Sequence, residues 1–373
     1  MTVTTPMNES ISATELAERL AAGEPVTILD VRSDADWVIE APSVTHVHVS
    51  ADEVLANPTA VAATLAGPVA VVCHRGMTAW PIADALRAAG TEAAVVEGGM
   101  RSWIGALQDR RIELDLDGAE LHQVQRPGRG CLSYVLIDGG DALVVDPAPD
   151  VAFYTDLVAA AGARVSTVVD THIHADHLSG ARDLVAATGA TLRLPAPALE
   201  RGVEFADIVE PLADGDRFEI GAVGVEAVGL PGHTTDMTGL LVGGRALIAG
   251  DSLFADGIAR PDLQRGDHDG ATAMARQLHA TLHERVLSLG DDAALLPGHA
   301  HPGVRPGAIA PTLADVRERV AALAIEDPDE FAEALLADMP PRPANYETVI
   351  AVNSGRHPFD AELETGGNSC STG

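Results

Sequence analysis

Three histidines and an aspartate occupy six consecutive positions in the segment T-H-I-H-A-D-H, Thr171–His177, directly after an apolar run. Burying so many polar side chains is costly unless each polar atom finds a partner. At the end of a strand, however, such side chains can converge on a cation. His233, Asp251 and His299 each follow a glycine at the end of a β-type run. Imidazoles with a carboxylate suit zinc, iron or manganese, so the sequence predicts a metal site.

Other histidines occur singly, and each is interpreted as a surface residue: His122, His268, His279, His283 and His301. A surface location is not expected for the histidines and aspartate of Thr171–His177 together with His233, Asp251 and His299. These residues all recur in one structural context, the end of a strand.

Cys73 begins a loop, C-H-R-G-M-T, between the apolar run Val69–Val72 and a predicted helix. Backbone N–H groups at the N-terminus of a helix stabilise an anion and lower the pKa of a thiol. Arg75 adds positive charge for an anionic sulfur donor. The alternative is a buried structural cysteine, which is common. Gly76 and the strand–loop–helix context favour the reactive interpretation.

Alternating strands and helices precede and follow this loop. We expect a parallel sheet with both faces covered, within a first domain at residues 8–110. The expected strands are Val26–Val31, Val69–Cys73 and Ala93–Val96, and the helices are Ala13–Ala21, Thr78–Ala89 and a short one containing Trp103.

The charged segment Arg110–Asp117 is predicted to be a linker to a second domain at residues 118–310. Its first two strands, Cys131–Ile137 and Ala142–Val145, form a hairpin through D-G-G-D. Cys131 is predicted to be a core residue. Two β-rich halves with helices predict a four-layer α/β arrangement. The further strands are Val165–Asp170, Val223–Val228, Leu240–Ile248 and Ala294–Leu296, and the helices are Phe153–Ala161, Leu178–Thr188 and Ala271–Leu287.

Residues 311–373 are predicted to be a helical extension with a disordered tail from Gly366 that carries Cys370, interpreted as incidental or as a sulfur acceptor. The formal net charge is −31 and every basic residue is arginine, which reflects either a GC-rich genome or a high-salt cytoplasm. Such a charge disfavours nucleic-acid and membrane partners. Three scattered cysteines and the absence of a signal-like N-terminus favour a reducing, cytoplasmic location. A homodimer is left open.

The order H-x-H-x-D-H, then His, Asp and His, resembles the metallo-β-lactamase superfamily over Glu120–Val304. That superfamily includes thioester hydrolases of the glyoxalase II type, lactamases and persulfide dioxygenases. Three segments resemble the persulfide dioxygenases. They are R-G-C-L-S-Y at Arg129–Tyr134, A-R-P-D-L-Q-R-G at Ala259–Gly266, where Ala259 replaces the family's glycine, and Leu336–Gly355, which contains P-P-R-P-A-N.

This resemblance implies a single Fe(II) held by His172, His233 and Asp251, a 2-His-1-carboxylate set that leaves other positions on the ion open. His174, Asp176, His177 and His299 would then orient the ligands and substrate, or remain from a second metal site. The alternative is a zinc thioester hydrolase with two metals and a bridging hydroxide. Arg260 and Arg265 are candidates for binding substrate carboxylates, because guanidinium groups match that geometry.

The segment Ile11–Leu107 resembles rhodaneses, whose active-site loop reads C-R-K-G-V-T. D-V-R at Asp30–Arg32 and E-G-G-x-x-x-W at Glu97–Trp103 also match that family. His74 stands where the loop often has arginine, and Pro42–Ser50 replaces the usual G-H-I-x-G-A element.

The two resemblances together imply iron-dependent oxidation of a low-molecular-weight thiol persulfide by O₂ to sulfite. Cys73, aided by Arg75, would transfer sulfane sulfur with thiosulfate or sulfite, and the fusion would keep the sulfur intermediate local. In the hydrolase alternative, the rhodanese-like domain is regulatory or inert.

Overall fold

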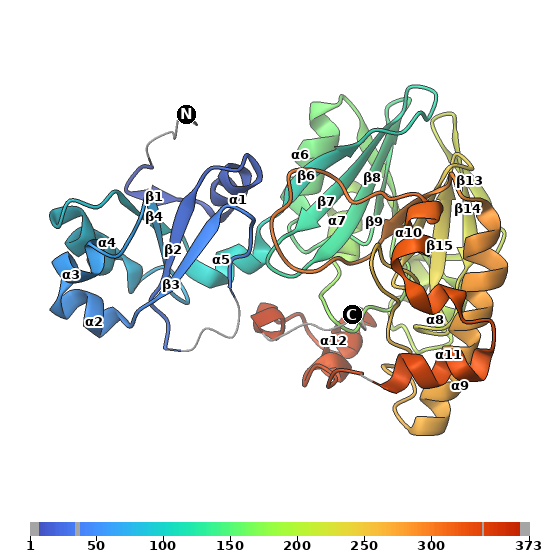
Figure 1. Ribbon diagram of the computed structural model, residues 1–373. Helices are drawn as coiled ribbons and strands as arrows, with labels where there is room; N and C mark the ends of the chain where they lie inside the picture. Colours follow the sequence, from blue (N-terminus) through green and yellow to red (C-terminus); the bar gives the residue numbers. More distant parts are fainter. Residues whose placement is uncertain (1–6, 34–37, 338, 366–373) are drawn as a thin grey trace. The chain divides into compact units, whose positions relative to one another are not determined.

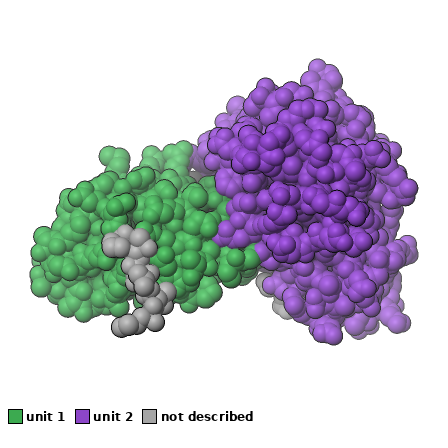
Figure 2. Space-filling view, turned by 90° about the horizontal axis from the view of Figure 1, so that it is seen from above, with its two compact units in different colours: residues 1–108, 125–130, 301–307 green, residues 109–124, 131–300, 308–373 purple. Residues whose placement is uncertain are grey.

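The computed structural model describes residues 7–33, 38–337 and 339–365, so the predicted tail and Cys370 lie outside the described residues. The chain forms two compact units (Figures 1 and 2). Unit 1 comprises residues 1–108, 125–130 and 301–307, and unit 2 comprises residues 109–124, 131–300 and 308–373. Among the described residues, no helix has the length and apolar character needed to cross a membrane.

Unit 1 contains a five-stranded sheet in the order β1-β5-β4-β2-β3, and its strands pair in parallel. The central strands are buried along their whole length, because helices cover both faces of the sheet. The expected parallel sheet is therefore confirmed. The strands are β1 (Ser10–Ile11), β2 (Val26–Asp30), β3 (Val44–His48), β4 (Val69–Val72) and β5 (Ala93–Val96).

Two apolar clusters lie on opposite faces of this sheet. On one face, Ile28 and Val72 pack with Leu16 of α1 (Ala13–Ala21) and Trp103 of α5 (Gly99–Gly105). On the other face, Leu29 and Val71 pack with residues of the remaining helices, α2 (Ala51–Ala56), α3 (Pro58–Ala62) and α4 (Ala79–Ala88). Alternate residues of each strand thus enter different cores.

Unit 2 contains two sheets. The seven-stranded sheet has the order β12-β11-β10-β9-β8-β7-β6, and the five-stranded sheet has the order β13-β14-β15-β16-β17. The strands of the first are β6 (Gln108–Ile112), β7 (Glu120–Arg126), β8 (Cys131–Asp138), β9 (Asp141–Val145), β10 (Arg164–Val169), β11 (Thr191–Pro195) and β12 (Val209–Leu212). Those of the second are β13 (Arg217–Ile220), β14 (Val223–Gly229), β15 (Thr238–Val242), β16 (Ala246–Gly250) and β17 (Ala294–Pro297).

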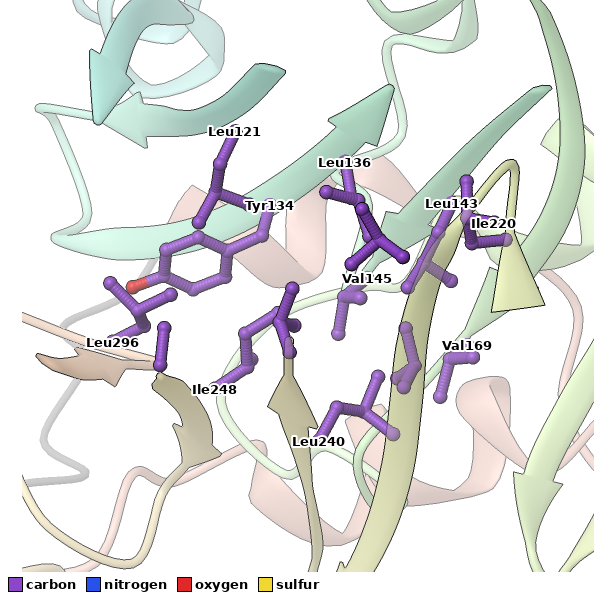
Figure 3. Packing of buried hydrophobic residues seen from close by; sticks show 14 of the residues in the cluster. Leu121, Tyr134, Leu136, Leu143, Val145, Val169, Ile220, Leu240, Ile248 and Leu296 are labelled. Carbon is purple, nitrogen blue, oxygen red and sulfur yellow. The ribbon is translucent and has the colours of Figure 1, made fainter. Parts of the chain in front are cut away.

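The main core of unit 2 lies between its two sheets (Figure 3). Tyr134 and Val145 of the larger sheet face Leu240 and Ile248 of the smaller one. Aliphatic residues fill most of this core, as the low aromatic content predicts. Tyr134 is an exception, and its buried hydroxyl donates a hydrogen bond to the carbonyl oxygen of Pro297 at 2.6 Å.

Helices cover the outer faces of both sheets, so the predicted four-layer αββα arrangement is confirmed. Helices α6 (Val151–Ala160) and α7 (Ala181–Thr188) contact β10 of the larger sheet. Helices α9 (His268–Thr281), α10 (Leu313–Arg319) and α11 (Pro328–Ala337) pack on the smaller sheet through an apolar cluster that includes Leu247 and Leu295. Two shorter helices, α8 (Ala196–Leu199) and α12 (Tyr346–Asn353), complete the α-helices among the described residues.

The structure corrects several element predictions. The run Leu240–Ile248 is two antiparallel strands, β15 and β16, because Gly243 and Gly244 form a turn with φ of 57° and 65°. The predicted linker begins as strand β6. Two histidines predicted at the surface are buried, because His122 pairs with Asp109 and His279 with the carbonyl oxygen of Ile325.

Candidate metal centre and cysteine loop

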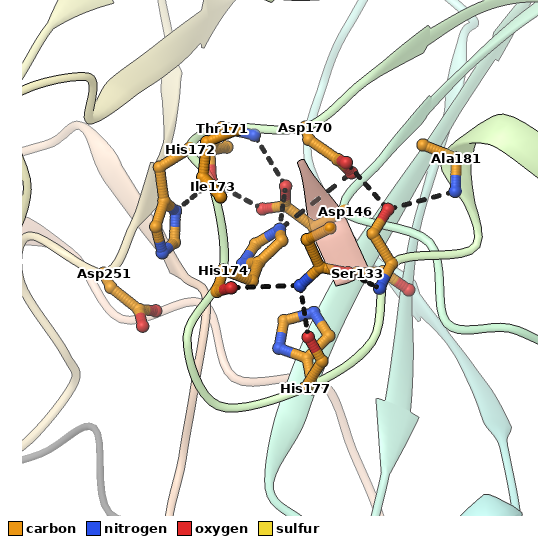
Figure 4. A network of polar contacts seen from close by, with 12 residues as sticks. Ser133, Asp146, Asp170, Thr171, His172, Ile173, His174, His177, Ala181 and Asp251 are labelled. Carbon is orange, nitrogen blue, oxygen red and sulfur yellow. Dashed lines mark hydrogen bonds and ion pairs between the residues drawn. The ribbon is translucent and has the colours of Figure 1, made fainter. Parts of the chain in front are cut away.

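The histidine-rich segment leaves strand β10 and is fixed by two buried carboxylates (Figure 4). Asp146, directly after β9, accepts hydrogen bonds from the backbone N–H of Thr171 at 2.7 Å and from its hydroxyl at 2.9 Å. Asp236 accepts one from the backbone N–H of Ile173 at 2.9 Å. Asp146 has a φ of 51°, a strained conformation for a residue with a side chain, which the surrounding contacts must maintain.

Asn353, at the C-terminal end of α12, binds the same segment with all of its amide hydrogen-bonding groups. Its Nδ2 donates to the carbonyl oxygens of His174 and His177, at 3.0 and 2.8 Å, and its Oδ1 accepts from the N–H of Ser179 at 3.0 Å. Glu364 accepts from the N–H of Leu178 at 2.9 Å. The C-terminal extension therefore positions this loop, a role that sequence analysis missed.

His172, His233 and Asp251 come together at the ends of β10, β14 and β16, with ligand atoms within 4.8 Å of one another. All three side chains are buried, and His172 Nε2, His233 Nε2 and Asp251 Oδ2 each have no hydrogen-bond partner among the described residues. Nε2 of His233 and Oδ2 of Asp251 lie 3.8 Å apart, beyond hydrogen-bonding distance. Two nitrogens and one oxygen that are buried, convergent and without a hydrogen bond fit a divalent cation.

Neighbouring groups fix the tautomers of both histidines. The hydroxyl of Thr171 donates to Asp146, so its oxygen accepts from Nδ1 of His172 at 3.0 Å. Nδ1 of His233 donates to the carbonyl oxygen of Arg260 at 2.8 Å. Each ring therefore directs the lone pair of Nε2 into the cluster.

The pKa values of two of these groups favour the forms that bind a metal. Burial lowers the pKa of His172 well below its usual value, as do the charges of His174 and His233, so this imidazole is neutral. Burial acts to raise the pKa of Asp251, but the charge and hydrogen bond of His299 and the charge of His233 lower it, so this carboxyl is ionised.

Glycine is required next to Asp251. A Cβ atom on Gly298 would lie 2.5 Å from Asp251 Oδ1, and one on Gly250, whose φ is 49°, would lie 2.8 Å from the hydroxyl oxygen of Thr171. The close approach at Gly298, and the close approach and positive φ at Gly250, therefore require a residue without a side chain.

A second group consists of Cys131, Asp176, His177 and His299, whose ligand atoms also lie within 4.8 Å of one another. Nε2 of His299 lies 2.6 Å from Asp176 Oδ2, and Nδ1 of the same ring lies 2.6 Å from Asp251 Oδ1. His299 thus connects this group to Asp251. Cys131 is buried as predicted, but its sulfur lies beside polar side chains rather than only apolar ones, which corrects its interpretation as a core residue.

Charged neighbours strongly perturb this second group. Burial acts to raise the pKa of Cys131, but the charges and hydrogen bonds of His177 and His299 lower it to about 5. Burial acts to lower the pKa of His299, but the carboxylates of Asp251 and Asp176 hold it well above its usual value. A thiolate beside imidazolium rings is the arrangement of a reactive cysteine.

His174 belongs to a third group, with Asp146 and Asp170. Its Nε2 lies 3.1 Å from Asp146 Oδ1, so this nitrogen has a carboxylate partner. Burial raises the pKa of Asp170 to about 6, and Asp146 acts in the same direction, although the charge of His174 lowers it. The histidine-rich segment therefore distributes its side chains among three clusters.

The two candidate substrate-binding arginines differ in their surroundings. Arg260 is fully buried; its guanidinium donates to Asp262 at 2.7 Å and to the carbonyl oxygens of Pro340 and Pro341 at 2.8 and 3.2 Å. It thereby holds the C-terminal segment through protein groups, which gives no support to a role in substrate binding. Arg265 is exposed.

In unit 1, the Cys73 loop packs closely against the turn before α5. A Cβ atom on Gly99 would lie 2.1 Å from the carbonyl oxygen of Cys73, and the N–H of Met100 donates to that oxygen at 2.8 Å. The glycines of E-G-G thus allow the loop to approach. Cys73 is buried in the apolar cluster that contains Val71 and Ile82, whereas Arg75 is exposed.

Two known families match separate parts of the chain. The family described as metallo-beta-lactamase superfamily matches residues 126–299, and the rhodanese-like domain matches residues 12–106. The chain joins a rhodanese-like domain to a metallo-beta-lactamase domain. Both domain families support the conclusion that the chain is an enzyme.

Curated relatives are similar to the metallo-beta-lactamase domain. Hydroxyacylglutathione hydrolase of Acidiphilium cryptum is 33% identical over 169 residues, which are 45% of this chain and 64% of the relative. Human mitochondrial persulfide dioxygenase ETHE1 is 27% identical over 191 residues, 49% of this chain and 69% of the relative. The chain thus spans about two thirds of each relative.

Solved structures show the same fold for this domain. ETHE1 from Myxococcus xanthus has a TM-score of 0.55 and 25% identity, with 64% of this chain and 99% of that chain covered. A metallo-beta-lactamase from Staphylococcus aureus has a TM-score of 0.59 and 23% identity, with 64% of this chain and 74% of that one covered.

Proposed function

We propose that the metallo-beta-lactamase domain uses one ferrous ion, held by His172, His233 and Asp251, to oxidise a low-molecular-weight thiol persulfide to sulfite. The observation that carries this proposal is the convergence of three buried ligand atoms that have no hydrogen-bond partner among the described residues. A ferrous ion held by two imidazoles and a carboxylate would supply the activation of O₂. Similarity to human persulfide dioxygenase ETHE1, and to ETHE1 from Myxococcus xanthus, supports the substrate class.

Neighbouring residues favour a site with three protein ligands. Thr171 and the backbone of Arg260 orient the two rings, while His299 engages Oδ1 of Asp251 and leaves Oδ2 as the single donor. Nε2 of His174 is held by Asp146, and His174 groups with Asp146 and Asp170 rather than with the three ligands, although its buried Nδ1 has no hydrogen-bond partner among the described residues. A set of three leaves more coordination positions for small molecules than a set of four, and this supports oxygenation over hydrolysis.

For the rhodanese-like domain, we propose that Cys73 carries sulfane sulfur as a persulfide and that exposed Arg75 attracts anionic donors such as thiosulfate or sulfite. The close packing of the Cys73 loop on Gly99 supports a defined geometry for the thiol. We also propose that the first domain comprises residues 8–110, the second residues 118–310 and the C-terminal extension residues 311–373. The proposed location is the cytoplasm.

The alternative function is zinc-dependent thioester hydrolysis. It is favoured by the 33% identity with the Acidiphilium hydrolase and by the second group of ligand-type side chains around Asp176 and His177. In that case two metals would occupy the two groups.

Oxygen consumption separates the two functions. The full-length protein, loaded anaerobically with Fe(II), is expected to consume O₂ and form sulfite when glutathione persulfide is added. His172→Ala is expected to lose both iron and activity, whereas His268→Ala, at an exposed histidine, should keep both. Zinc-loaded protein that cleaves hydroxyacylglutathione, with iron-loaded protein that consumes no O₂, would establish the hydrolase instead.

A further inference from the structure

Cys131 is a nucleophilic side chain that the proposed oxidation does not use. It begins β8, makes a backbone bridge with His299, and carries a free thiol. Its sulfur lies within 4.8 Å of a ring nitrogen of His177, a ring nitrogen of His299 and a carboxylate oxygen of Asp176. A cysteine that served only as core packing would not need two imidazoles and a carboxylate around its sulfur.

Cys131 also lies close to a proposed metal ligand, Asp251. His299 lies between them, because one of its nitrogens belongs to the group around Cys131 and Nδ1 is 2.6 Å from Asp251. The sulfur is thus separated by one imidazole ring from a proposed metal ligand. Cys131 and His299 are both buried, with 7% and 6% of their surface exposed.

We propose that Cys131 accepts the sulfane sulfur of the low-molecular-weight persulfide and holds it as a protein-bound persulfide beside the His172–His233–Asp251 group. This rests on the proposed function for the class of substrate, a thiol persulfide. It adds a covalent step to that function and a residue that performs it.

The step is a thiol–persulfide exchange and requires no oxidant. The Cys131 thiolate attacks the outer sulfur of R–S–SH, a new S–S bond forms, and the original S–S bond breaks. The electron pair leaves with the thiolate RS⁻, which takes up the proton that the Cys131 thiol gave up. The products are Cys131–S–SH and the free thiol RSH.

Cysteine variants of the full-length protein isolate this step. Cys73→Ser combined with Cys370→Ser leaves Cys131 as the single cysteine, and further addition of Cys131→Ser gives a matched cysteine-free control. Each protein is mixed anaerobically with glutathione persulfide. Released glutathione is counted per chain, and alkylated peptides are analysed by mass spectrometry. Circular dichroism and iron content show whether the variants fold.

The protein with Cys131 alone is expected to release one glutathione per chain and to yield a Cys131 peptide heavier by one sulfur atom, whereas the control releases none. If Cys131→Ser fails to fold, the peptide from the other protein decides the matter. An unmodified Cys131 peptide overturns the inference. Alkylation of Cys131 only after a chelator is added also overturns it, because the thiolate is then a metal ligand.

The outcomes also separate this inference from the proposed function. Sulfur transfer to Cys131 without later O₂ consumption would contradict the oxidation and leave the inference standing. O₂ consumption at the wild-type rate by Cys131→Ser would contradict the inference and leave the oxidation standing.

Discussion

Replacement of Asn353 by alanine tests how strongly the C-terminal extension positions the histidine-rich segment. The substitution removes three hydrogen bonds and leaves the carbonyl oxygens of His174 and His177 and the N–H of Ser179 without this partner. Each bond contributes about 1 kcal/mol net, and a buried group left unsatisfied costs about 1–3 kcal/mol. We therefore expect Asn353→Ala to lower the free energy of unfolding of unit 2 by about 3–5 kcal/mol.

The same substitution is expected to weaken metal binding. Asn353 holds the backbone of His174 and His177, in the segment that begins with the ligand His172, so its loss should loosen the position of that ligand and lower the affinity for iron. Asn353→Asp retains the acceptor for Ser179 but loses both donors and places a charge beside two carbonyl oxygens, so it should be at least as damaging. Glu347→Ala, at an exposed position of the same helix, is the matched control and should change neither property.

The assay uses urea denaturation of the metal-free protein. All three tryptophans, Trp37, Trp80 and Trp103, lie within residues 1–108, so fluorescence reports on unit 1, whereas circular dichroism reports on both units. We expect the dichroism transition to shift to lower urea while the fluorescence transition stays in place. Competition with a chelator measures iron affinity. A loss of less than about 0.5 kcal/mol, as is usual for surface substitutions, with unchanged iron affinity would refute the reasoning.

Three further predictions concern individual side chains. Thr171→Val removes the acceptor for Nδ1 of His172, so iron affinity measured by chelator competition should fall about 10–100-fold, and an unchanged affinity would exclude this role. Alkylation of Cys131 should proceed at a constant rate from pH 8 down to about pH 6 and decline near pH 5, because the lowered pKa keeps the thiolate present; a decline near pH 9 would contradict this. Arg260→Met should lower the free energy of unfolding by about 1–3 kcal/mol, since Asp262 loses one arginine partner but keeps Arg342, whereas Arg265→Ala should leave it unchanged and raise KM for the persulfide.

Much of the architecture could be predicted from local patterns. Apolar β-branched runs such as Val69–Val72 and Ala93–Val96 are strands, because a parallel sheet with helices on both faces buries every residue of its central strands. Helix α1 matches its predicted range, since Ser12 caps its first turn and its apolar residues repeat at helical spacing. The apolar run Leu240–Ile248 favours a single strand, but Gly243 and Gly244 adopt positive φ and turn the chain between β15 and β16.

The candidate site was predictable only in part. His172, His233 and Asp251 each follow a β-type run, so a ligand position at a strand end could be inferred for each. Their convergence could not, because β10 belongs to the larger sheet and β14 and β16 to the smaller one. Asn353 could not be found in this way, because nothing local to α12 indicates that its amide binds carbonyl groups more than 170 positions away. Cys131 lies on an apolar strand, and only the tertiary structure shows that its sulfur meets His177 and His299.

The central claim is most directly tested by anomalous diffraction at the iron and zinc absorption edges, from crystals of the full-length protein loaded anaerobically with Fe(II). We expect one iron peak per chain, within bonding distance of Nε2 of His172, Nε2 of His233 and Oδ2 of Asp251. Two zinc peaks, the second bound by Asp176, His177 and His299, would contradict it.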